Sequence, residues 1–160
     1  MVTEMSAYRG GTYALFLVIE EAVTEEVGAL GRHRFPKGVH IYVGSAVSGL
    51  ERRLVRHGRP VKKVHWHVDR LTVRPAVQVV GAVTFGPDGP DECEIVRVLT
   101  RLPWTQVTPH RFGSSDHDCP GHLVRLGERP ELVEMAVRSL EEAGGSWLSF
   151  DGIERPGGPE

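Results

Sequence analysis

Two tyrosines, one arginine and one histidine have the residue types and spacing that phosphoryl-transfer chemistry requires. Tyr13 and Tyr42 lie in two apolar runs that we expect to form neighbouring strands, so that both phenols can face one cleft. Arg53 lies on the helix predicted to follow and offers a planar donor fork that suits a phosphate. His57, four residues later on the same helical face, is a candidate second acid or base. Phosphodiester hydrolysis needs a group that activates water and a cation that faces the developing charge.

The phrases around these residues occur in an order that resembles a known superfamily. GTY ends at Tyr13, YVG begins at Tyr42, and Arg53 follows that second glycine on the next helix, as in the GIY-YIG endonuclease superfamily. The closer resemblance is to a poorly characterised GIY-YIG-like family that is sometimes fused to endonuclease III. The phrases that carry it, between about Gly11 and Leu126, are YVGSA, RRLVRH, HWHVD, ECE and FGSSDHDCPGHL.

This resemblance implies a DNA-processing domain, in the first instance an endonuclease that uses Mg²⁺ or Mn²⁺ and associates with DNA-repair enzymes. It assigns the activation of the nucleophile to Tyr13, with Tyr42 beside it, and the stabilisation of the phosphate to Arg53. Two alternatives remain open at this point: a catalytically inactive DNA-binding module on the same fold, and a scaffold that binds another phosphorylated ligand. Tyr13 and Tyr42 can also be core residues with satisfied hydroxyls, because strands are rich in tyrosine.

The metal-binding carboxylate is the part of the pattern that this chain does not follow. In the DNA-repair branch of the superfamily the metal-binding glutamate lies further along the helix, and the corresponding position here falls near Leu99, which cannot bind a metal. Glu92 and Glu94, one turn or more earlier, are candidate Mg²⁺ ligands, and Asp69 is another.

A second group of residues has the chemistry of a zinc site. His117, Cys119 and His122 lie within six residues of one another, and Cys93 lies on a separate predicted helix. Four such ligands satisfy a closed tetrahedral site for structural zinc. In the family that the chain resembles, cysteine is common at the position of His117. The alternative is that Cys93 is an apolar core residue, that Cys119 is a loop thiol, and that the histidines bond the backbone.

One segment concentrates positive charge. Between Arg52 and Arg74 the only acid is Asp69, and the basic residues are Arg52, Arg53, Arg56, Arg59, Lys62, Lys63, Arg70 and Arg74. Such a surface can bind nucleic-acid phosphates even in a mildly acidic protein. We therefore expect DNA-backbone contacts from Arg52, Arg56, Lys62, Lys63, His65 and His67. The alternative is a solvated helical face whose charges pair with acidic segments elsewhere.

The elements that must position these residues can be predicted from hydrophobic periodicity and turn residues. The expected strands are 11–20, 25–30, 39–44, 76–85, 122–126, as an edge strand, and 147–150. The expected helices are 50–57, with Ser48 as a candidate cap, 62–72, 92–102 and 130–143. This order predicts a mixed α/β or α+β fold with a small, mainly antiparallel sheet flanked by helices.

Length and composition set outer limits on these expectations. With 160 residues the chain suits a single domain, with a GIY-YIG-like core over about 11–126, a C-terminal helix and short strand over 130–150, and a frayed tail over 151–160. The formal net charge of −2 by itself argues against a nucleic-acid partner. Counting the charges segment by segment reverses this inference, because the basic residues concentrate between Arg52 and Arg74. Two cysteines and no visible membrane span or secretory signal lead us to expect a cytoplasmic protein.

Overall fold

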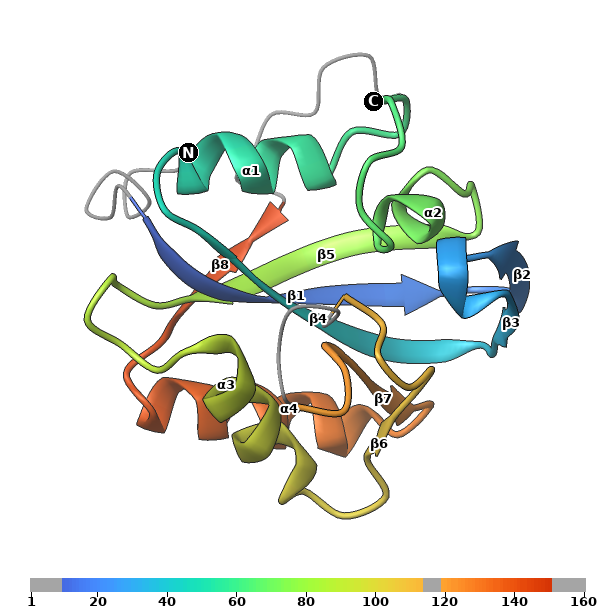
Figure 1. Cartoon of the computed structure of the whole chain (residues 1–160). Coiled ribbons are helices and arrows are strands. Elements are labelled where there is room, and N and C mark those ends of the chain that lie inside the picture. Colours follow the sequence, from blue (N-terminus) through green and yellow to red (C-terminus); the bar gives the residue numbers. More distant parts are fainter. Residues whose placement is uncertain (1–9, 114–118, 151–160) are drawn as a thin grey trace.

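A six-stranded antiparallel sheet forms the centre of this computed structural model, which describes residues 10–113 and 119–150 (Figure 1). The strand order is β6-β7-β4-β1-β5-β8. The strands are β1 (Gly11–Ile19), β4 (Gly38–Ala46), β5 (Val77–Thr84), β6 (Gln106–Val107), β7 (Leu123–Gly127) and β8 (Ser146–Ser149). The predicted mixed α+β fold with an antiparallel sheet is confirmed.

Helices cover both faces of this sheet, and alternating residues of β1 supply a core to each face (Figure 1). Tyr13 and Leu15 face the side that carries α1 (Leu50–His57) and α2 (Asp69–Thr72). Phe16 faces the side that carries α3 (Glu92–Thr100) and α4 (Pro130–Glu142). A small hairpin of β2 (Val23–Glu26) and β3 (Arg32–Phe35), joined through the 3-10 helix η2 (Gly28–Leu30), contributes to the first core.

The segment 62–72 differs most from its prediction, because only Asp69–Thr72 is helical. The Asp69 carboxylate accepts hydrogen bonds from the backbone N–H groups of His65 and Trp66, at 2.8 and 2.9 Å. An aspartate that bonds the backbone ahead of it competes with helix formation and favours a helix start. The apolar spacing that suggested a long helix therefore belongs to a loop that ends in one helical turn.

Smaller differences occur at element ends. Strand β2 ends at Glu26, and the last three residues of the predicted strand 25–30 form the 3-10 helix η2. Gly49, in a left-handed conformation, precedes α1 in place of the expected Ser48 cap. Strand β7 is interior because the unpredicted two-residue β6 pairs with its outer edge. Along the described part of the chain, no helix has the length and apolar character needed to cross a bilayer.

Candidate active site

Tyr13 and Tyr42 lie on adjacent strands and point to the same face of the sheet. Leu15 is opposite Tyr42 and Gly44 is opposite Tyr13 in the β1–β4 register, so the two tyrosines are diagonal neighbours with ring centroids 6.3 Å apart. A Cβ atom at Gly44 would lie 2.6 Å from the Tyr13 hydroxyl, so only glycine leaves room for this ring. The glycine of the YVG phrase thus makes the space in which the Tyr13 phenol sits.

His57 brings an imidazole from α1 onto the Tyr13 hydroxyl. Tyr13 Oη lies 2.7 Å from His57 Nε2, and both side chains are 1% exposed. Burial, followed by the positive charge of Lys62, lowers the pKa of His57 to about 3, which leaves the ring neutral at neutral pH. A neutral Nε2 can accept the phenolic proton, and His57 Nδ1 is buried with no hydrogen-bond partner among the described residues.

Arg53 reaches the same place from the preceding turn of α1. Its Nη1 donates to the Ser45 carbonyl at the end of β4, at 2.8 Å, and its guanidinium lies 4.4 Å from the Trp66 ring centroid. Its side chain also hydrogen-bonds with Tyr13, so its charge acts on that phenol. A strand carbonyl and an aromatic face therefore fix the direction of this cation.

Glu92 completes the group from the opposite side of the sheet, at the start of α3. Its negative charge raises the pKa of both Tyr13 and Tyr42, so this carboxylate acts electrostatically on the two phenols. Its side chain is 11% exposed, and Oε1 lies 3.6 Å from His122 Nδ1. We call Tyr13, Tyr42, Arg53, His57 and Glu92 the tyrosine cluster.

Both phenols of the tyrosine cluster are held in their protonated form. Burial is the main cause that raises the pKa of Tyr13 well above its usual value, with Tyr42 as the next cause and Arg53 acting in the opposite direction. Burial also raises the pKa of Tyr42 strongly, and Glu92 adds to this. The cluster thus offers neutral hydroxyls that can donate or relay a proton, beside one fixed cation and one carboxylate.

Asp69, a candidate metal ligand from the sequence, is occupied by internal hydrogen bonds. Arg56 donates from both terminal nitrogens to the two carboxylate oxygens, at 2.9 Å each, in addition to the backbone donors of His65 and Trp66. Burial raises the pKa of Asp69, but these hydrogen bonds outweigh it and hold the pKa below its usual value. Asp69 therefore organises the loop and is not free to bind a cation. We call Asp69, Arg56 and the two backbone donors the aspartate hub.

The basic segment forms a groove of about 590 Å³ between α1 and the loop after it. Arg52, Arg59 and Lys63 line it and are exposed. Lys62 also lines it, but its ammonium group donates to the carbonyls of Arg56 and His57 at the end of α1. The groove therefore combines exposed charges with charges that stabilise the loop.

The two histidines expected at the DNA backbone have internal contacts. His65 is exposed and packs edge-on against Trp66, with centroids 4.7 Å apart. His67 Nδ1 accepts a hydrogen bond from the backbone N–H of Gly113, and burial lowers its pKa. Trp66 was not among the site residues predicted from the sequence. Its ring packs against the guanidinium groups of both Arg53 and Arg56. The alternation of aromatic and basic residues around Trp66 was the available signal.

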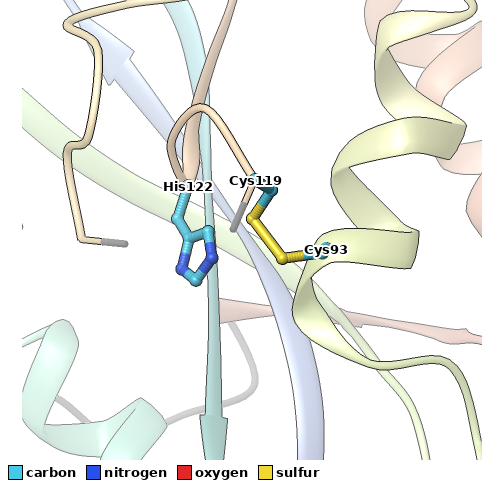
Figure 2. Close-up of side chains that lie close together, drawn as sticks. All are labelled: Cys93, Cys119 and His122. Atoms are coloured by element: carbon cyan, nitrogen blue, oxygen red, sulfur yellow. A yellow bond between two sulfur atoms is a disulfide. The ribbon is translucent and has the colours of Figure 1, made fainter. Parts of the chain in front are cut away.

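The remaining metal candidates separate into different environments. Glu94 forms a reciprocal capping box with Asp91 at the start of α3, so its carboxylate stabilises the helix end. Leu99 is fully buried in the core. Cys93 and Cys119, expected as zinc ligands or separate thiols, form a disulfide beside His122 (Figure 2). His117 lies outside the described residues.

Comparison with known proteins gives one match. A protein-family model described as "Domain of unknown function DUF123" matches residues 12–145. No curated protein and no solved structure matches. The GIY-YIG assignment made from short phrases is therefore wrong as a family assignment, because the match is to a different family and no GIY-YIG family matches. The matched region also extends past residue 126 and through α4, which the resemblance had left outside.

Proposed function

The chain belongs to the DUF123 family, and we propose from its site that it is a divalent-metal-dependent hydrolase of DNA phosphodiester bonds. One observation carries this proposal. A phenol, an imidazole and a guanidinium, from β1 and α1, meet around Tyr13, and the charge of the Glu92 carboxylate on α3 acts on the phenols from the other side of the sheet. These are the groups that an in-line attack of water on a phosphodiester uses.

Tyr13 is the group that orients the attacking water. Its phenol stays protonated because burial raises its pKa, and its oxygen lies 2.7 Å from His57 Nε2. As the water oxygen attacks phosphorus, the phenolic oxygen takes the water proton and passes its own proton to Nε2. The bond from phosphorus to the leaving oxygen breaks, that oxygen takes a proton from solvent, and His57 releases its extra proton to solvent, which restores the starting state. The negative charge of the bound phosphate favours the protonated His57 in this step.

Arg53 is the group that stabilises the charge of the pentacoordinate phosphorus. Its guanidinium is held by the Ser45 carbonyl and the Trp66 ring. A donor that is fixed before the reaction needs no reorganisation during it, which is the condition for strong electrostatic catalysis. Loss of this side chain is therefore expected to lower the rate more than it lowers the affinity for DNA.

Glu92 is the residue that fits a divalent cation. Asp69 is held in the hub and Glu94 in the capping box, whereas the charge of Glu92, whose Oε1 lies 3.6 Å from His122 Nδ1, acts on both tyrosines. Mg²⁺ is commonly bound by one or two carboxylates together with waters and substrate phosphates, so one carboxylate is a sufficient protein contribution. When bound, the ion would neutralise phosphate charge and lower the pKa of a bound water.

The groove beside α1 supports DNA as the substrate. Arg52, Arg59 and Lys63 offer exposed charges on the same helix and loop that carry Arg53 and His57. Contacts of this kind hold the phosphate backbone without reading its sequence. Binding is expected to weaken steeply with salt. On duplex DNA, the logarithm of the binding constant should fall against the logarithm of the salt concentration with a slope of about −0.9 for each neutralised phosphate.

The test is cleavage of plain, nicked, flapped and branched duplex DNA with Mg²⁺ or Mn²⁺, by the wild-type chain and by Arg53→Ala. The expected result is metal-dependent cleavage by the wild type and a loss of at least about 100-fold in the variant. Equal cleavage by both proteins would identify a contaminating nuclease and overturn the proposal.

Deep burial of the tyrosine cluster supports a second candidate, DNA binding without cleavage. Tyr13 and His57 are 1% exposed and Tyr42 is 8% exposed, so access to the phenols is narrow. Salt-dependent binding without cleavage of any of the four DNA forms favours this candidate. Absence of binding at low salt excludes both.

A further inference from the structure

Cys93, Cys119 and His122 bring two sulfurs and an imidazole together between α3 and the start of β7 (Figure 2). Each side chain offers one potential ligand atom, and these atoms all lie within 4.8 Å of one another. Cys119 is 7% exposed and His122 is 1% exposed, while Cys93 is half-buried, so the group is shielded from bulk water except on the side of Cys93. The proposed cleavage mechanism makes no use of this group.

The chemistry of these three groups favours a soft or borderline cation. Zn²⁺ binds thiolate and imidazole ligands well, whereas Mg²⁺ prefers oxygen ligands. We propose that Cys93, Cys119 and His122 form a zinc site that is available only when the disulfide is reduced. Cys93 and Cys119 then alternate between a disulfide and zinc ligation, according to the thiol state, and His122 becomes a ligand only in the reduced state.

The change of state balances in protons and electrons. A thiol reductant, such as a dithiol, transfers two electrons and two protons to the disulfide; the S–S bond breaks and the reductant becomes a disulfide. Zn²⁺ then binds the two sulfurs as thiolates and displaces their two protons. Water or another small ligand takes the fourth position of a tetrahedral ion.

The backbone geometry suits this exchange. The two cysteines have Cα atoms 5.6 Å apart, and two thiolates on one zinc ion lie about 3.8 Å apart, as Zn–S distances near 2.3 Å require. Side-chain rotation is therefore expected to separate the sulfurs without moving α3. The backbone of His122 is fixed, because its N–H donates to Phe112 and its carbonyl accepts from Val43, at 2.7 and 2.8 Å.

The neighbouring carboxylate favours the same site. Glu92 Oε1 lies 3.6 Å from His122 Nδ1, and a carboxylate beside a ligating imidazole orients the ring and raises its basicity. A zinc ion with two thiolates carries no net charge, so it would not add a cation beside Glu92. Glu92 also belongs to the tyrosine cluster, so the zinc site is tested by metal content and not by cleavage, and it stands or fails separately from the proposed hydrolase.

The experiment uses the full chain in two states, with the disulfide intact and after anaerobic reduction and removal of the reductant. Zinc stoichiometry is measured by elemental analysis, and Co²⁺ is added in parallel as a spectroscopic probe. The expected result is one Zn²⁺ per reduced chain and none per oxidised chain. Reduced chains with Co²⁺ are expected to show a thiolate charge-transfer band and the intense visible bands of a tetrahedral ion.

The variants Cys93→Ser and Cys119→Ser are expected to lose both signals, whereas His33→Gln, in the β2–β3 hairpin, keeps them. The oxidised wild-type protein is a control that needs no substitution, so a misfolded variant does not decide the outcome. Three results would overturn the proposal: no stoichiometric metal in the reduced folded chain, equal binding by the oxidised chain, or reduction only upon unfolding.

Discussion

The tyrosine cluster and the aspartate hub are two polar groups that share helix α1, yet they differ in how fully their hydrogen bonds are satisfied. In the hub, the Asp69 carboxylate accepts from both terminal nitrogens of Arg56 and from two backbone N–H groups. In the cluster, His57 uses Nε2 for Tyr13, while its buried Nδ1 has no hydrogen-bond partner within residues 10–113 and 119–150.

This difference separates a structural role from a chemical one. A buried polar group with all its hydrogen bonds made stabilises one conformation, and its removal affects folding. A buried group with unused capacity costs stability, and such sites concentrate where chemistry occurs. Substitutions in the hub are therefore expected to change stability, and substitutions in the cluster are expected to change activity.

The largest expected effect is that of Tyr13→Phe on cleavage. The substitution removes only the hydroxyl that faces His57, so the water loses the group that orients it. A loss of about 100-fold to 10,000-fold in single-turnover rate is expected, with a change of about 1 kcal/mol in the free energy of unfolding. An unchanged rate would show that the Tyr13 hydroxyl has a structural role and no role in cleavage.

The second effect is that of Asp69→Asn on stability. The amide keeps the shape but leaves Arg56 without its carboxylate, and we expect a loss of about 3 kcal/mol in the free energy of unfolding. Urea denaturation measures this, with Glu134→Gln, in an exposed ion pair, as the matched control near zero. Wild-type stability should also fall with acid as Asp69 protonates below its unfolded pKa of 3.8, and the variant lacks this dependence.

Gly44→Ala tests the packing that links the two tyrosines. The new methyl group would lie 2.6 Å from the Tyr13 hydroxyl and 3.0 Å from the Tyr42 ring, so one ring must move. Overpacking of this kind costs about 2 kcal/mol. Gly31→Ala is the control, because a Cβ there meets no atom within 4 Å, although its own positive φ also costs some strain. A cost no larger than that of the control would contradict the tight fit.

The smallest effect, counted per pH unit and per histidine, is a loss of stability in mild acid. Burial lowers the pKa of His57 to about 3 and that of His40 to about 4, from 6.5 in the unfolded chain. The unfolded state therefore binds more protons below pH 6.5, and stability falls from there toward pH 4, by at most about 1.4 kcal/mol per pH unit for each histidine. His57→Gln should flatten this slope in a urea titration, and an unchanged slope would show that His57 does not contribute.

The sequence predicts the sheet and the long helices because their signals are local. The continuous apolar run along residues 11–20 and the apolar face of 130–143 correspond to β1 and α4 within a residue or two. The loop before α2 was predicted as a helix. The hydrogen bond that prevents a helix there, from the His65 backbone N–H to the Asp69 carboxylate, forms only in the folded chain. Residue spacing carries no information about such a bond.

The candidate site could be predicted in part for the same reason. Tyr13, Tyr42 and Arg53 could be predicted from the resemblance to GIY-YIG phrases, and His57 from its helical spacing after Arg53. The different roles of Glu92 and Glu94 could not be predicted, because they depend on how α3 begins, with Glu94 in the capping box. The pairing of Cys93 with Cys119 likewise depends on tertiary structure, since 26 residues separate the two cysteines.

One pair of carboxylates on a single helix turn tests the central claim most directly. Cleavage of DNA with Mg²⁺ is measured for Glu92→Gln and Glu94→Gln, with far-UV circular dichroism to confirm folding. The charge of Glu92 acts on both tyrosines and Glu94 closes the capping box, so we expect cleavage to be abolished in the first variant and retained in the second. Full metal-dependent cleavage by folded Glu92→Gln would contradict the assignment of the tyrosine cluster as the catalytic site.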